Sequence, residues 1–434
     1  MLIRFFNISQ RIDNKCKICY NFDNNRFRGD TLMRSSIKLI ACILAILMVF
    51  TLVSCSNQAE TTKKSKTTLI TTATSATTAG NQNSQTPAPA PQKDIKNLIL
   101  IIGDGMGPQH IEAGQLSEGK TYDFTTWIDS VCNTNSINSD NAEVLTDSAA
   151  SATALATGTL TKNGYVGLNK DGTELSTILD IAKIIYDKSV GVVTTDYLYG
   201  ATPSGFSAHA NDRNDSATIT LSQISSDVDY LCGLRSDSHY APYIEQIEEN
   251  EIYYSTSLSD KKAILDSDSV FLPINIEDGT NDSVDLKDAA TLAIEYLERD
   301  EDGFVLMIEQ AYIDKCSHNN DIDGMLKRMK SLNETVEAVM DWVGDRDDTA
   351  VIVTADHETG GLSVSKNAIY DKSHNAQGNN VYYSWSSVDH TQTKVRIFVY
   401  GVDVDFATVS QYRIPTVIKN TDVFVLMKKI LNFG

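Results

Sequence analysis

Several carboxylate and imidazole side chains of this sequence come directly after apolar runs. Asp104 and Glu309 each stand at the end of such a run, and the pair Asp356-His357 follows a third. A single Asp behind a strand is usually a turn residue or a helix cap. Imidazoles and carboxylates together, however, are ligands that zinc takes in proteins, and carboxylates without imidazole suit magnesium. Three runs that end in these residue types therefore predict a metal site.

Further imidazoles lie downstream. Asp314 and His318 are four residues apart, so on a helix they share one face and could hold one cation. Taken alone, such a pair is more often a solvated surface pair. His390 precedes another apolar run, residues 395–400, and adds a further imidazole.

An alanine-rich stretch carries the candidate nucleophile. Residues 147–156 favour a helix that Gly158 would end, and Ser148 falls in its first turn. A helix N-terminus offers free N–H groups and a positive dipole, which stabilise an alkoxide or a bound phosphate. Serine is also a preferred helix cap, so these grounds alone leave a capping role open.

The apolar runs alternate with helical segments. This alternation predicts an α/β fold, a three-layer α/β/α sandwich around a mostly parallel central sheet. Ligands of such sheets bind beyond the carboxyl ends of the strands, where the polar residues above would meet. The predicted strands are 97–102, 190–194, 304–308, 350–353 and 395–400, and the predicted helices are 147–156, 174–186, 286–298, 324–343 and 422–431.

Composition argues against some classes of function. The chain has 434 residues, 41% of them hydrophobic, and can bury one large core or two average ones. With 37 Lys and Arg against 57 Asp and Glu, its formal net charge is −20, which argues against nucleic-acid binding through bulk electrostatics. The seven cysteines have no spacing that indicates a disulfide framework or a zinc ribbon.

A short apolar run near the N-terminus indicates a targeting signal. Arg34 and Lys38 precede residues 39–53, an apolar run of fifteen residues, and a bilayer span needs about 20. A signal peptide is therefore predicted. The run ends in Ser54-Cys55, which resembles a bacterial lipoprotein box. The resemblance implies that Cys55 is lipid-modified and anchors the protein to the outer face of the cytoplasmic membrane.

This signal divides the chain into four predicted segments. Residues 1–32 precede Met33, which we expect to be the true start, and 33–55 are the signal peptide. Residues 56–94 are rich in Thr, Ser, Ala and Pro and are expected to form a disordered stalk, because they offer little apolar surface to bury. Residues 95–434, which hold the candidate site residues, are expected to form the catalytic domain.

Taken together, the motifs resemble the alkaline phosphatase family. They occur in the family's order and extend over nearly the whole of residues 95–434. The resemblance implies hydrolysis of phosphate monoesters, small or polymeric, through a phosphoserine, by an enzyme that is usually a homodimer. The matching motifs are Asp104 in Ile-Gly-Asp-Gly-Met-Gly, Asp147-Ser148-Ala149, Thr202-Pro203 with His209 and Arg213 downstream, Glu309 with Asp314 and His318, Asp356-His357, and His390-Thr391.

The resemblance also implies two zinc ions and one magnesium ion, with a role for each matching residue. Ser148 would be the nucleophile, and Arg213 would grip two phosphoryl oxygens with its planar guanidinium. His209 would have a structural role, and His110, His239 and His374 would be ordinary histidines. The metal ligands would be Asp314, His318 and His390 for the first zinc, Asp104, Asp356, His357 and the Ser148 oxygen for the second, and Asp104, Thr202 and Glu309 for magnesium.

One position departs from the family pattern. Many family members have Asp or His two residues before the magnesium-site threonine, where this chain has Gly200. Lys315 corresponds to the lysine that pairs with that Asp in bacterial enzymes. We therefore expect a loosely held magnesium ion and a Lys315 ammonium free to turn towards substrate phosphate. The alternative is that a water molecule or a neighbouring side chain such as Tyr199 fills the place of the missing side chain, with no functional consequence.

Other functions are also compatible with parts of this pattern. Phosphodiesterases of the same superfamily usually lack the magnesium set, and sulfatases need a Cys/Ser-x-Pro-x-Arg context that is missing around Ser148. A surface lipoprotein that binds phosphate without turnover is the alternative outside enzymes. Residues 215–285 are expected to build a crown around the site, and they do not reveal the physiological substrate.

Overall fold

Long apolar runs form the centre of the fold. The strands β1 (Asn97–Gly103), β9 (Phe304–Gln310) and β10 (Thr349–Thr354) are buried along their whole length, as expected where helices cover both faces of a parallel sheet. They are parallel neighbours in the order β10-β1-β9, with Ile102 opposite both Glu309 and Thr354. This register brings their carboxyl ends to one level.

The structure is a computed structural model that describes residues 93–277, 279–376, 378–410 and 417–434. The segments predicted from residue 1 to 92, including Met33 and Cys55, lie outside the described residues. Within the described ranges, no helix has the length and apolar character that a membrane span requires.

The described residues include a central sheet of ten strands. Only β16 (Val395–Tyr400) runs antiparallel to its described neighbours, so the prediction of a mostly parallel sheet is confirmed. The strand order is β17-β2-β16-β10-β1-β9-β5-β6-β8-β7. The remaining strands are β2 (Ile128–Asn133), β5 (Ser189–Tyr197), β6 (Tyr230–Leu234), β7 (Tyr253–Tyr254), β8 (Val270–Ile274) and β17 (Val417–Lys419).

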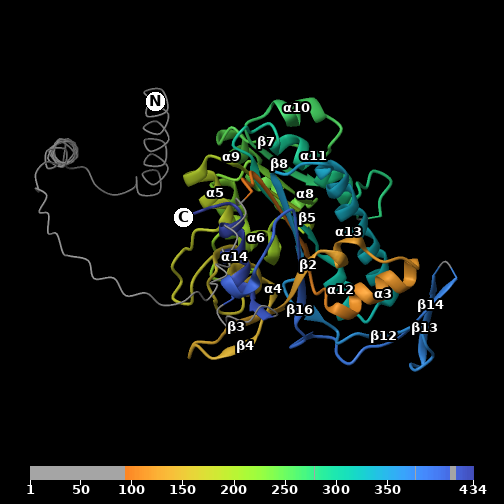
Figure 1. Ribbon diagram of the computed structural model, residues 1–434. Coiled ribbons are helices and arrows are strands. Elements are labelled where there is room, and N and C mark those ends of the chain that lie inside the picture. Colours follow the sequence, from red (N-terminus) through yellow and green to blue (C-terminus); the bar gives the residue numbers. More distant parts are fainter. Residues whose placement is uncertain (1–92, 278, 377, 411–416) are drawn as a thin grey trace, which may run out of the picture. The chain divides into compact units, whose positions relative to one another are not determined.

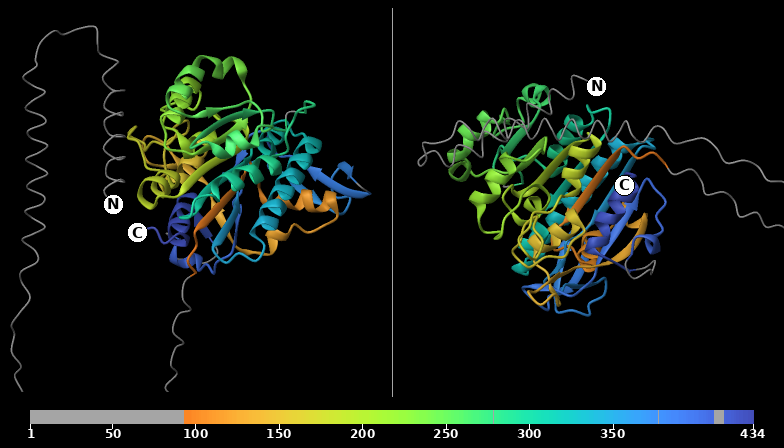
Figure 2. Two further views of the ribbon diagram at one scale, coloured as in Figure 1. Left: turned by 90° about the horizontal axis from the view of Figure 1, so that it is seen from above. Right: turned by 90° about the vertical axis from the view of Figure 1, so that its left-hand side faces the viewer.

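Two layers of helices sandwich this sheet (Figures 1 and 2). One layer contains α4 (Ser148–Thr157), α5 (Ile178–Tyr186), α6 (Ala201–Ser207) and α14 (Asn420–Ile430), which contact one another. The other contains α3 (Pro108–Glu118), α11 (Leu286–Leu297), α12 (Tyr312–His318) and α13 (Ile322–Val343). The predicted α/β/α sandwich is therefore present.

Residues 215–285, which were expected to build a crown around the site, also contribute to the central sheet. Three of the strands in this region, β6, β8 and β7, extend the central sheet at the edge beyond β5. Each is short, and proline interrupts the run of β8 at Pro273, so the sequence shows no long apolar pattern there. The helices of the region are α7 (Ser216–Ile224), α8 (Asp237–Tyr240), α9 (Ile244–Glu249) and α10 (Lys261–Asp266).

Small sheets outside the central one complete the site region. The pair β11 (Glu358–Thr359) and β15 (His390–Thr391) sets His390 opposite Thr359. The sheet of β12 (Ser363–Ser365), β13 (Lys372–Ala376) and β14 (Asn379–Ser384) packs beside α3, and its β13–β14 hairpin projects outward there (Figure 1). A fourth sheet pairs β3 (Asn135–Ile137) with β4 (Glu143–Leu145) near α4.

Candidate active site

The site lies at the carboxyl-terminal ends of the central strands, as predicted, next to α4 and α12. Asp104 follows β1, and the next residue, Gly105, has a φ of +71°. A Cβ atom on Gly105 would lie 2.8 Å from the Asp314 backbone, so only glycine lets this loop approach α12 so closely. The Gly105 N–H also donates to Asp356 Oδ1 at 3.1 Å. The loop after β1 therefore links two of the predicted ligands.

Asp314, His318 and His390 form the first cluster of potential metal ligands. Their donor atoms all lie within 4.8 Å of one another. His318 Nε2 is 3.3 Å from Asp314 Oδ2, and His390 Nε2 is 3.7 Å from Asp314 Oδ1. The Nδ1 atoms face backbone carbonyls, of Val388 at 2.5 Å for His318 and of Thr146 at 2.9 Å for His390. Such contacts orient an imidazole so that Nε2 is presented to a metal.

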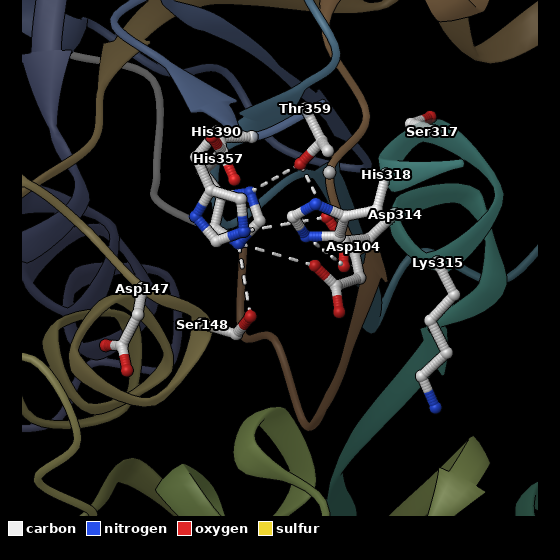
Figure 3. A network of polar contacts seen from close by, with 12 residues as sticks. Asp104, Asp147, Ser148, Asp314, Lys315, Ser317, His318, His357, Thr359 and His390 are labelled. Carbon is white, nitrogen blue, oxygen red and sulfur yellow. Dashed lines mark hydrogen bonds and ion pairs between the residues drawn. The ribbon is translucent and has the colours of Figure 1, made fainter. Parts of the chain in front are cut away.

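Asp104, Asp314 and His357 form a second cluster, again with donor atoms within 4.8 Å. His357 is completely buried and its Nε2 lies 3.5 Å from Asp104 Oδ1 and 3.2 Å from Asp356 Oδ2. His357 also stacks on His390, with ring centroids 3.5 Å apart. Figure 3 shows the rings of His357 and His390 and the carboxylates of Asp104 and Asp314 converging on one small region.

Ser148 reaches this region from the start of α4. Its Oγ lies 3.1 Å from His357 Nε2, and its side chain points towards the imidazoles in Figure 3. The capping role belongs to Asp147, whose carboxylate accepts from the Ala150 N–H at 2.9 Å. The Ser148 hydroxyl is therefore not used as a helix cap.

Asp147 also binds Arg213, a pairing that the sequence pattern did not predict. Its Oδ2 accepts from Arg213 Nη1 at 3.1 Å and from the Gly164 N–H at 2.9 Å. The charge of Arg213 helps to lower the pKa of His357, although burial and then His390 are the larger causes. The sequence does contain a clue to this pair, because an acidic residue stands directly before the candidate nucleophile. As the cap of α4, Asp147 uses Oδ1 for the helix and can offer Oδ2 to a cation.

Glu309 and Thr202 form a third, all-oxygen group. Glu309 is the penultimate residue of β9 and is buried, and one of its carboxylate oxygens accepts a hydrogen bond from the Thr194 hydroxyl. The Thr202 hydroxyl, in the first turn of α6, is buried and has no hydrogen-bond partner among the described residues. Oxygen-only ligands are typical of magnesium.

The carboxyl groups of the site are buried next to one another, so that negative charge accumulates there. Burial, followed by the charge of Asp356, raises the pKa of Asp104 well above its ordinary value. Burial and the charge of Asp314 raise the pKa of Asp356. Burial would also raise the pKa of Asp314, but the hydrogen bond from His318 and the charge of His357 lower it. Bound cations would offset this repulsion.

Unpartnered buried oxygens support the same conclusion. Asp104 Oδ1, Asp356 Oδ2 and Thr202 Oγ1 are among the buried side-chain atoms that have no hydrogen-bond partner of good geometry within the described part of the chain. Buried polar atoms are nearly always satisfied, and all three belong to the predicted metal ligands. The residues of this site therefore fit the metal ions that the family resemblance implies.

Lys315 corrects one expectation from the sequence. Its Nζ is not free but lies 2.5 Å from Asp196 Oδ1, at the carboxyl end of β5. Burial would lower the pKa of Lys315, but the charge and hydrogen bond of Asp196 raise it. In Figure 3 the Lys315 side chain runs away from the imidazoles. The partner was missed because it stands four residues before Gly200 rather than at that position.

The remaining histidines lie outside the two clusters. His209 Nε2 contacts the Leu175 carbonyl at 3.0 Å, and His110 Nε2 contacts Ser317 Oγ at 3.0 Å. His239 packs on Tyr199, and His374 pairs with Asp323 at 2.5 Å. These contacts are all to residues outside the two clusters.

A family model and curated relatives place the chain among known proteins. The model described as alkaline phosphatase matches residues 95–230 and 215–384. Alkaline phosphatase 3 of Bacillus subtilis (strain 168) is 31% identical over 299 residues, which are 64% of this chain and 64% of that protein. Alkaline phosphatase 4 of the same organism is 30% identical over 320 residues, 67% of this chain and 68% of that protein. The match thus spans about two thirds of each relative.

Solved structures agree with this result. Alkaline phosphatase from the Antarctic bacterium TAB5 superposes with a TM-score of 0.67 at 26% identity, covering 79% of this chain and 99% of that one. A variant of the same enzyme with Mg bound in the M3 site gives a TM-score of 0.68 at 26% identity, with the same coverage.

Proposed function

Since this chain belongs to the alkaline phosphatase family, we propose that it hydrolyses phosphate monoesters through a phosphoserine on Ser148. The observation that carries the proposal is the position of the Ser148 hydroxyl. It stands at the first residue of α4, is not used as a cap, and faces His357 and the two clusters of metal ligands. A phosphoserine bound there would also benefit from the positive end of the helix dipole.

Hydrolysis would take place in two steps, and each replaces one oxygen atom on phosphorus by another. In the first step the Ser148 oxygen forms a bond to phosphorus, and the bond from phosphorus to the alcohol oxygen breaks. In the second step the oxygen of a water molecule replaces the serine oxygen and phosphate leaves. Asp147 holds Arg213 beside the nucleophile, where its planar guanidinium can bind two phosphoryl oxygens through both steps.

Two zinc ions and one magnesium ion would be held by the three ligand sets that the family resemblance implies, in which Asp356 rather than Asp314 joins Asp104 and His357. Asp314, His318 and His390 would hold one zinc, and Glu309, Thr202 and Asp104 the magnesium. Asp104, Asp356 and His357 would hold the other zinc next to the Ser148 oxygen. When bound, these ions would lower the pKa of the attacking hydroxyl and stabilise the negative charge that develops on phosphate and alcohol oxygens.

The variant Ser148→Ala tests the nucleophile. We expect at least a 1,000-fold loss of p-nitrophenyl phosphate hydrolysis, since removing the serine nucleophile of another hydrolase lowers kcat by about 2 × 10⁶-fold. Metal content should be unchanged because the carboxylates and imidazoles remain. Acid quenching followed by peptide mass spectrometry should find phosphate on Ser148 of the wild type.

Ser216→Ala is the matched control, since Ser216 also follows a capping Asp at the first position of a helix, α7. Wild-type turnover in Ser148→Ala would contradict the proposal. Faster hydrolysis of bis(p-nitrophenyl) phosphate than of the monoester by the wild type would favour the phosphodiesterase alternative.

We further propose that the enzyme acts as a homodimer at the bacterial cell surface, anchored by lipid on Cys55. The lipoprotein-like signal and the Thr-, Ser- and Pro-rich stretch that follows it support the anchor, and the family resemblance supports the homodimer. Cys55→Ser should leave an active enzyme that no longer partitions into detergent with membranes. Continued partitioning would place the anchor elsewhere, and sedimentation of the purified enzyme as a monomer would contradict the homodimer.

A further inference from the structure

The carboxylate of Asp196 fills the space that a side chain at position 200 would enter. Gly200 caps α6 with an extended backbone, so no positive φ requires glycine there. A Cβ atom on Gly200 would lie 2.6 Å from Asp196 Oδ2 and 2.9 Å from the Tyr197 carbonyl oxygen. The Asp196 side chain therefore occupies the place where a side chain at position 200 would begin.

Asp196 contacts Lys315 and is linked through Thr194 to Glu309 of the all-oxygen group. Its Oδ1 accepts from Lys315 Nζ, and only 17% of its side chain is exposed. Its backbone N–H donates at 2.8 Å to Thr194 Oγ1, the hydroxyl that in turn donates to Glu309. After burial, the charge of Asp196 is the largest cause that raises the pKa of Glu309. Asp196 thus lies close to the all-oxygen group.

We propose that Asp196 is the positioning residue of the magnesium site, acting through the cation's water molecules and through Lys315 in place of any side chain at position 200. Magnesium usually keeps several waters, and a carboxylate just outside its ligands can accept hydrogen bonds from them. This inference rests on the proposed function, because it assumes the magnesium site at Glu309 and Thr202. It replaces the expectation of a loosely held ion.

Magnesium titration of the zinc-loaded, magnesium-depleted protein by calorimetry tests this role without reference to turnover. Asp196→Ala should weaken magnesium binding about 10 to 100-fold, the usual effect of losing a partner of a metal ligand. Asp196→Asn keeps the shape but removes the charge and should also weaken binding. It serves as a second variant if Asp196→Ala does not fold, as judged by its thermal unfolding.

Exchanging the two positions provides the decisive comparison. Gly200→Asp alone should weaken magnesium binding, because its Cβ would meet the Asp196 carboxylate. The double variant Asp196→Ala/Gly200→Asp empties that space and should recover at least part of the lost affinity. Asp237→Ala is the matched control, since Asp237 also pairs with a cation, Arg235, but on the surface.

The outcomes separate this inference from the proposed function. Equal magnesium affinity in wild type and Asp196→Ala, or tighter binding by Gly200→Asp than by wild type, would overturn the role of Asp196 while leaving a phosphatase. A wild type that binds no magnesium would overturn both the role of Asp196 and the magnesium part of the proposed function. Failure of Ser148→Ala to lose activity would affect the nucleophile alone.

Discussion

Arg213 depends on a residue that is itself part of the α4 cap. The same Asp147 carboxylate accepts hydrogen bonds from Ala150 and Gly164 and forms the ion pair with Arg213. The start of α4, the loop at Gly164 and the Arg213 guanidinium are therefore fixed together, one residue before the proposed nucleophile. One nitrogen of Arg213 is used by Asp147, which leaves the other donors of the planar group for phosphate.

Arg213→Lys should reduce kcat/KM for p-nitrophenyl phosphate about 10 to 100-fold, because hydrogen bonds to charged groups contribute roughly 1.5–3 kcal/mol and a lysine cannot reproduce the two-pronged geometry. Steady-state kinetics and the inhibition constant of inorganic phosphate measure the effect. Arg235→Lys, in an exposed Arg–Asp pair, is the control and should behave as wild type. An unchanged phosphate inhibition constant in Arg213→Lys would show that Arg213 does not bind phosphate.

At the scale of elements, the contact between α4 and α6 sets Ser148 relative to Thr202. The two helices meet at Gly205, where an added Cβ would lie 2.6 Å from Ala152 Cβ and 3.0 Å from the Ala152 carbonyl carbon. Small residues on both sides let the helix backbones approach closely. Ser148, the proposed nucleophile, and Thr202, a proposed magnesium ligand, each lie near the start of one of these helices.

Gly205→Ala should therefore destabilise the protein and weaken catalysis together. Overpacking a buried contact costs roughly 1–3 kcal/mol, more than the helix propensity gained from alanine. Urea unfolding gives the free energy, and p-nitrophenyl phosphate hydrolysis gives the activity. Adding Ala152→Gly removes the Cβ–Cβ contact and should restore part of both. If Gly205→Ala were as stable and active as wild type, the spacing of these helices would not matter.

The sequence predicted the elements that bury long apolar runs and missed those that depend on partners distant in sequence. The strands around Asp104, Glu309 and Asp356 were predictable because a strand buried on both faces is apolar throughout. The short strands β6 and β8 were missed because five residues between polar turns carry no clear periodicity. The Asp196–Lys315 pair was missed because only the fold brings β5 beside α12.

For the whole molecule, acid stability depends on buried groups that must stay in one protonation state. His110 is such a group and lies outside the metal clusters, joining α3 to α12. Its Nδ1 accepts from the Gly107 N–H at 3.1 Å, and Ser317 Oγ donates to the Ile313 carbonyl, so Nε2–H donates to Ser317. Both contacts require a neutral ring with the proton on Nε2, and a second proton would remove the acceptor at Nδ1.

Burial lowers the pKa of His110 to about 4, from an ordinary value of 6.5. Between these two values the unfolded chain binds the extra proton and the folded protein does not, so the stability that this histidine contributes is complete above pH 6.5 and is lost as the pH falls towards 4. The loss would be about 3 kcal/mol over that interval.

Urea unfolding of the metal-depleted protein at a series of pH values measures this loss of stability. His110→Gln keeps a polar side chain without this titration, so its free energy of unfolding should fall less steeply than that of the wild type below pH 6.5 and run parallel to it above. The other titrating groups are common to both proteins and cancel in the difference. Parallel curves throughout the range would mean that the His110 ring accepts the second proton in the folded state.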